Sequence, residues 1–82
     1  MHAVPKELTC PITQELLIDP VLAEDGHTYE RAAITRWFST GNTRSPVTNE
    51  ELEGKKLISN HVLKKACESA SLIARREASI SL

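Results

Sequence analysis

Short apolar runs separated by turn-forming residues divide the chain into small elements. Residues 21–23 and 28–30 predict two short strands, joined by a turn that contains Asp25-Gly26. Asp-Gly is a strong hairpin signal, because glycine adopts positive φ without a steric penalty. Residues 57–59 predict a third short strand. The first half of the chain is therefore predicted to contain a β-hairpin.

Two other segments have apolar residues at helical spacing. Residues 30–39 place an apolar pair at Ala33 and Ile34 and another one turn later, and Gly41 supplies the stop. A second helix is predicted from His61, because Asn60 is a favourable N-cap. Its inner stripe consists of Leu63, Ala66, Cys67, Ala70, Ile73 and Ala74.

Two long loops complete the predicted organisation. Residues 5–20 begin and end at proline and contain several apolar residues, so this loop either packs on the core or faces a partner. Residues 42–56 are polar and rich in turn formers. The pattern predicts a small α+β domain over residues 5–76, with a flexible N-terminus at residues 1–4 and a frayed tail at residues 77–82.

Composition narrows the function classes. The chain has 82 residues, 40% of them hydrophobic, which is enough for one modest core and suggests no deep substrate pocket. A net charge of −1 gives no reason to expect nucleic acid or an anionic membrane as partner. No segment approaches the ~20 apolar residues of a membrane span. The two cysteines are too few for a disulfide framework, so we expect a reduced intracellular protein.

Metal does not explain how the loops are held. Two loops around a hairpin and a helix form the ground plan of a RING domain, which needs about eight Cys or His ligands for two zinc ions. This chain has two cysteines, three histidines and no C-x-x-C pair, and a single four-ligand site would need nearly all of them to converge. We therefore expect no metal, and a hydrogen-bond network drawn from Cys10, Thr13, Glu15, Asp25, His27, Ser45, Thr48 and Asn49.

Five sequence phrases occur in order over residues 5–70: C-P-I-T, D-P-V, D-G-H-T-Y-E-R-x-A-I, S-P-x-T-N and L-I-x-N-x-x-L-K. They resemble the U-box, the zinc-free relative of the RING domain. The resemblance implies a small α+β fold with a hairpin, a third strand, a central helix, a C-terminal helix and no cofactor. It also implies a ubiquitin ligase that binds a ubiquitin-conjugating enzyme and promotes ubiquitin transfer to a lysine of a protein substrate, without a covalent intermediate.

The resemblance also suggests which residues meet the conjugating enzyme. It places Ile12, Trp37 and Pro46 in a shallow apolar groove, with Thr13, Gln14 and Ser45 beside them. Ile12 and Trp37 have an alternative reading as core residues, and Pro46 as a rigid turn residue.

Arg44 matches the basic residue that bridges conjugating enzyme and ubiquitin in active members of the family. Orienting a flexible thioester-linked ubiquitin makes productive geometry common, and the guanidinium fork can satisfy acceptors on two partners. The alternative is a solvated loop arginine.

Other readings stay open at this stage. A degenerate U-box would keep the fold as an adaptor or dimerisation domain, and Leu72, Ile73 and Ile80 permit a homodimer. A small metal-binding protein is disfavoured by the ligand count. Cys10 is a poor candidate nucleophile, because it adjoins Pro11 with no base nearby in sequence. The implied localisation is the cytoplasm or nucleus of a eukaryotic cell. This would be a host cell if the protein is a delivered bacterial effector.

Overall fold

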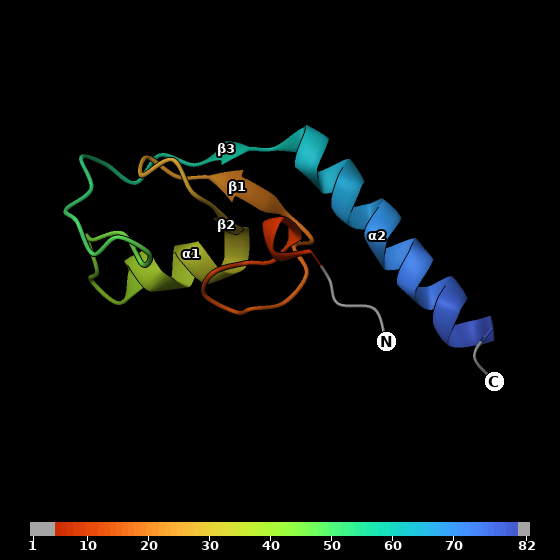
Figure 1. Ribbon diagram of the computed structural model, residues 1–82. Helices are drawn as coiled ribbons and strands as arrows, with labels where there is room; N and C mark the ends of the chain where they lie inside the picture. Colours follow the sequence, from red (N-terminus) through yellow and green to blue (C-terminus); the bar gives the residue numbers. More distant parts are fainter. Residues whose placement is uncertain (1–4, 81–82) are drawn as a thin grey trace.

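A small three-stranded sheet joins the two helices. The computed structural model describes residues 5–80 and, for side chains, residues 5–72. The elements follow the order η1 (Lys6–Leu8), β1 (Pro20–Leu22), β2 (Thr28–Glu30), α1 (Arg31–Ser39), β3 (Ile58–Ser59) and α2 (His61–Ile80). In Figure 1, α1 lies below the sheet, while α2 extends away from the end of β3.

The sheet has the order β2-β1-β3, and both pairings are antiparallel. Val21 is the central residue, since it pairs with Tyr29 on one side and with Ser59 on the other. Gly26 has a φ of 82°, the left-handed conformation that the hairpin turn requires. The predicted hairpin and third strand are confirmed.

Strand β1 begins one residue earlier than predicted, at Pro20. Proline is tolerated as the first residue of a strand, because no hydrogen bond is required of its nitrogen there. The carbonyl oxygen of Pro20 is used instead, accepting a hydrogen bond from the amide of Asn60 at 2.9 Å. Pro20 thereby joins the sheet to the start of α2.

Helix α1 covers the sheet with the face that the sequence predicted. Ile34 and Phe38 are buried, and Ala33 and Trp37 are partly buried against the same core. The helix ends where expected, since Gly41 has a φ of 93° and its amide donates to the carbonyl of Phe38 at 3.0 Å.

Helix α2 starts at the predicted cap. The side-chain oxygen of Asn60 accepts a hydrogen bond from the amide of Leu63 at 3.1 Å. Cys67 faces inward and is buried, as its place on the inner stripe predicted. The helix continues to Ile80, beyond the predicted domain end at residue 76. The predicted flexible N-terminus (residues 1–4) and the last two residues of the predicted tail lie outside the described residues.

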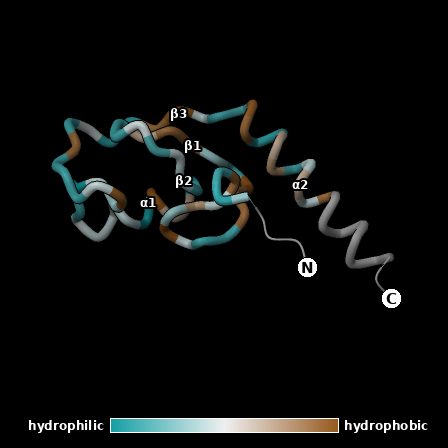
Figure 2. The backbone as a smooth tube through the Cα atoms, in the orientation of Figure 1, coloured by the Kyte–Doolittle hydropathy of each residue, from teal (hydrophilic) through white to brown (hydrophobic). Residues whose placement is uncertain are grey.

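The core is built mainly from aliphatic residues and cysteines. Buried apolar residues come from the first loop, the hairpin and both helices: Cys10, Leu17, Val21, Ala23, Tyr29, Ile34, Phe38 and Cys67. Figure 2 shows hydrophobic segments recurring along the first part of the chain, whereas the segment before β3 is mainly hydrophilic. In the described part of the chain, no helix is long and apolar enough to cross a membrane.

Ile34 provides a test of this packing, because its side chain is fully buried on α1. Replacing Ile34 with valine removes one methylene and should lower the free energy of unfolding by about 0.5–1.5 kcal/mol in urea denaturation. The exposed neighbour Thr35 offers a control, and Thr35→Ala should leave stability unchanged or slightly raised. Equal stability of Ile34→Val and the native protein would contradict the packing described.

Candidate functional site

The first loop, residues 9–19, closes on itself before it reaches the sheet. Thr9 and Leu16 form an isolated antiparallel bridge, and the amide of Gln14 donates to the carbonyl of Cys10 at 2.7 Å. Gln14 has a φ of 61°, a left-handed conformation that is uncommon for residues other than glycine. Ile12 lies in this tight turn and is half-buried, with its side chain packed against the core.

The carboxylate of Glu30 anchors the first loop to the start of α1. It accepts hydrogen bonds from the amides of Ile18 at 2.7 Å and Asp19 at 3.0 Å. The amide of Glu30 in turn donates to the sulfur of Cys10 at 3.3 Å. Both ends of the first loop are therefore tied to one residue, directly before α1.

Asp25, in the hairpin turn, connects the hairpin to the second loop (residues 42–56). Its Oδ2 accepts hydrogen bonds from the hydroxyls of Tyr29 and Ser45, each at 2.6 Å, and its Oδ1 accepts the amide of His27 at 2.9 Å. Burial raises the pKa of Asp25, but the hydrogen bonds from Ser45, Tyr29 and His27 together lower it below its ordinary value. Asp25 is therefore ionised at neutral pH.

Tyr29 is the buried donor of this network. Burial and the neighbouring Asp25 carboxylate both raise the pKa of the Tyr29 hydroxyl well above its ordinary value. Tyr29 consequently keeps its proton and donates it to Asp25 across the physiological pH range.

Ser45 sets the shape of the second loop. Only 2% of the residue is exposed, and its hydroxyl oxygen accepts the amides of Val47 at 3.2 Å and Thr48 at 3.0 Å while donating to Asp25. Sequence reasoning placed Ser45 among the contacts to a conjugating enzyme. Its hydroxyl makes these three hydrogen bonds within the domain, so the side chain fixes the turn that holds the half-buried Pro46. The contact of Ser45 with a conjugating enzyme stays a prediction.

Trp37 connects α1 to the second loop. Its indole Nε1 donates a hydrogen bond to the carbonyl oxygen of Arg44 at 2.8 Å, and its ring is half-buried against the core. The side chain of Arg44 is exposed, and its Nη1 donates to the carbonyl of Asn49 at 3.3 Å. Trp37 is therefore partly a core residue, and its contact with a conjugating enzyme stays a prediction.

The predicted site residues lie in two separate segments, the first loop and the second loop with helix α1. Arg44, Ser45 and Pro46 are consecutive, and the carbonyl of Arg44 links this segment to Trp37. Ile12 belongs to the first loop together with Thr13 and Gln14, both of which are exposed. Ile12 and Trp37 pack against the same buried cluster, so the core connects the two segments.

The loops are held by a network that the sequence predicted in part. Cys10, Thr13, Asp25, Ser45 and Thr48 all accept or donate hydrogen bonds through their side chains. Among the described residues, the side chains of Glu15, His27 and Asn49 make no such bond.

Glu30 and Tyr29 were missed as members of this network. Glu30 lies at the predicted start of a helix, where an acidic residue has an ordinary role at the positive end of the dipole. The only available signal was its position at the junction of the predicted strand and the predicted helix, from which its carboxylate can reach the first loop. A second unpredicted link runs from Arg31 to Asp19, with Nε and Oδ2 2.8 Å apart, and from Arg31 to the hydroxyl of Ser59.

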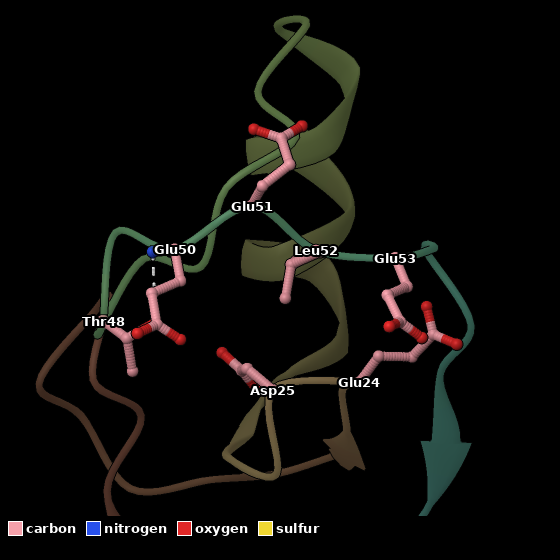
Figure 3. A pocket seen from close by; sticks show the side chains of 7 residues that line it. All are labelled: Glu24, Asp25, Thr48, Glu50, Glu51, Leu52 and Glu53. Carbon is pink, nitrogen blue, oxygen red and sulfur yellow. Dashed lines mark hydrogen bonds between the residues drawn. The ribbon is translucent and has the colours of Figure 1, made fainter.

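An acidic hollow of about 420 Å³ lies between the hairpin turn and the second loop (Figure 3). Its lining is Glu24, Asp25, Thr48, Glu50, Glu51, Leu52 and Glu53. Over the described residues, no three His, Cys, Asp or Glu side chains are placed to hold a metal ion.

Neither cysteine is presented as a nucleophile. Cys10 and Cys67 are both free thiols and both are buried. Burial, with the charge of Glu30 as a smaller cause, raises the pKa of the Cys67 thiol. Neither thiol is therefore exposed to a second reactant.

Comparison with known proteins agrees with this fold. The sequence pattern of the U-box domain matches residues 4–71, so the chain belongs to the U-box family. The fold is accordingly a small α+β unit in which a three-stranded antiparallel sheet accompanies two helices.

Several curated relatives share this domain. "U-box domain-containing protein 18" of Arabidopsis thaliana is 39% identical over 83% of this chain and 10% of its own length. "WD repeat, SAM and U-box domain-containing protein 1" of Danio rerio is 49% identical over 79% of this chain and 13% of its own length. "Putative E3 ubiquitin-protein ligase LIN-1" of Lotus japonicus is 47% identical over 79% of this chain and 4% of its own length. The chain thus spans only a small part of these relatives.

Asp25→Asn tests the network at its centre. The substitution removes the charged acceptor of three hydrogen bonds and should lower the free energy of unfolding at pH 7 by about 1.5–3 kcal/mol. Because folding lowers the pKa of Asp25, its contribution is complete above the ordinary value of 3.8 and disappears as the pH falls through the folded value. Urea denaturation at pH 7, 5 and 3 should show a difference that shrinks only at the lowest pH.

Tyr29→Phe is the milder companion variant, because it removes one of the three donors and keeps the ring. We expect a loss of about 1–3 kcal/mol at pH 7. Native stability of both variants at pH 7 would refute the role given to Asp25.

Proposed function

We propose that this domain is a U-box ubiquitin ligase module that binds a ubiquitin-conjugating enzyme and promotes ubiquitin transfer to a substrate lysine. Membership of the U-box family supports the ligase class, as does the name of the Lotus japonicus relative. The observation that supports the proposal most directly is the hydrogen bond from Trp37 to the carbonyl of Arg44. It ties a proposed docking residue to the proposed ubiquitin-orienting residue.

The proposed docking surface consists of Ile12, Trp37 and Pro46, with Thr13 and Gln14 at its rim. All three apolar side chains are half-buried and still offer apolar area to a partner, and those of Ile12 and Trp37 are held against the core. A surface that is ordered before binding loses little conformational entropy when the partner arrives. We expect a small, transient interface below about 1,200 Å² of total buried area.

Arg44 is proposed to act on the rate of transfer. Ubiquitin linked to the conjugating enzyme by a flexible thioester adopts many poses, and few of them expose the thioester carbonyl to an amine. A guanidinium that donates to ubiquitin and to the conjugating enzyme at once selects productive poses, which lowers the entropic part of the barrier. The nucleophile remains the substrate amine, and the leaving thiolate remains on the conjugating enzyme.

The partners follow from this mechanism: a conjugating enzyme, ubiquitin and a protein substrate, in the cytoplasm or nucleus of a eukaryotic cell. Substrate choice is expected to lie outside this domain, because the described residues form no second recognition module besides the U-box fold.

Two substitutions separate docking from catalysis. Ile12→Ala should abolish measurable binding of the uncharged conjugating enzyme, because it removes the apolar anchor of the first loop. Arg44→Ala should leave that binding intact and slow discharge of ubiquitin to free lysine about 10- to 100-fold. This range corresponds to one charged hydrogen bond of ~1.5–3 kcal/mol in the transition state. Titration with uncharged enzyme and single-turnover discharge measure the two effects.

Folding of each variant is checked by its urea midpoint, since Ile12 also contacts the core. A panel of conjugating enzymes is needed, because each ligase works with only some of them. If the native domain accelerates discharge from none of them, the ligase function is wrong and the adaptor reading takes its place.

A further inference from the structure

Arg44 and Glu51 face each other across the second loop. They form an isolated antiparallel bridge, with hydrogen bonds on either side of it from the amide of Ser45 to Glu50 and from the amide of Leu52 to Thr43. Residues directly opposite each other in such a pair have Cβ atoms about 4.5–5.5 Å apart. The loop register therefore brings Glu51 beside Arg44.

The two side chains form an ion pair. Nε of Arg44 lies 3.7 Å from Oε2 of Glu51, and both side chains are largely exposed. Figure 3 shows the Glu51 carboxylate pointing away from the acidic hollow, whereas the carboxylates of Glu24 and Glu53 lie close together within it. Glu51 is thus the acidic residue of this cluster that turns toward the guanidinium.

These contacts engage two of the three nitrogens of the Arg44 guanidinium. Glu51 is paired with Nε, and the carbonyl of Asn49 accepts a hydrogen bond from Nη1. A guanidinium has five N–H donors, and Nη2 donates to no acceptor among the described residues of this chain. The side chain is held from one side while donors remain for partners.

We propose that Glu51 is a positioning residue that holds Arg44 in the orientation used for ubiquitin transfer. This inference rests on the role of Arg44 under the proposed function. An arginine side chain has many rotamers, and each excursion from the productive one delays the alignment of ubiquitin. An acid opposite Nε restricts those rotamers without occupying Nη2. Glu51 therefore assists transfer instead of competing with the acceptors on ubiquitin and the conjugating enzyme.

Glu51→Gln tests this inference, because it removes the charge and keeps the shape of the side chain. Single-turnover discharge at saturating charged enzyme should slow about two- to fivefold, the range expected of an exposed ion pair. Binding of the uncharged conjugating enzyme should not change. In an Arg44→Ala background, Glu51→Gln should have no further effect on discharge.

Two controls separate the ion pair from general electrostatics. Glu50→Gln removes the same charge from the adjacent exposed residue and should leave the rate unchanged. Raising the ionic strength from 0.05 M to about 1 M should bring the native and Glu51→Gln rates together, because the Debye length falls to about 3 Å.

Three results would overturn the inference: Glu51→Gln discharging as fast as the native domain or faster, an equal slowing in the Arg44→Ala background, or an equal slowing by Glu50→Gln. Each is distinct from a failure of the proposed function. That failure would appear as no discharge by the native domain, or as Arg44→Ala matching the native rate.

Discussion

The ionised carboxylate of Asp25 is the interaction on which the arrangement of this domain depends. It gathers the hydroxyls of Tyr29 and Ser45 and the amide of His27, and so connects the hairpin, the core and the second loop. Leaving these donors buried without an acceptor would cost about 1–3 kcal/mol each, a large part of the stability of a small domain. Charge at Asp25 is what makes the connection strong, since hydrogen bonds to an ionised acceptor are roughly twice as strong as neutral ones.

Glu30 is a second carboxylate that accepts hydrogen bonds from a loop, at the other end of α1. One carboxylate holds the first loop at the start of the helix, and Asp25, with the bond from Trp37 to Arg44, holds the second loop near its end. Helix α1 is consequently bracketed by two loops of fixed conformation. Under the proposed function, the docking surface is already ordered on folding, so weak contacts would suffice for specific docking of a partner that must also leave.

Sequence reasoning predicted the regular elements because their signals are local. Gly26 indicates the hairpin turn and Asn60 the start of α2, and both act within a few residues. The start of β1 was predicted one residue late, because the sequence does not show that the carbonyl of Pro20 accepts a hydrogen bond from Asn60, forty residues further along the chain. Glu30 and Glu51 were missed because their partners lie across a loop. Their pairings depend on the loop register, which follows from tertiary hydrogen bonds and has no periodicity in the sequence. The family resemblance suggested the candidate site residues, and the structure shows how Trp37, Arg44 and Ser45 are held by hydrogen bonds.

The central proposal is that hydrogen bonds to carboxylates, without metal, hold the docking surface in shape. This surface binds a conjugating enzyme that carries ubiquitin as a thioester and orients that ubiquitin for transfer. The most direct measurement is single-turnover discharge of ubiquitin from a pre-charged conjugating enzyme to free lysine, with the native domain, in the presence and absence of EDTA. The account predicts acceleration over the conjugating enzyme alone, at the same rate with and without the chelator. Loss of the acceleration in EDTA, or no acceleration with any conjugating enzyme tested, would contradict it.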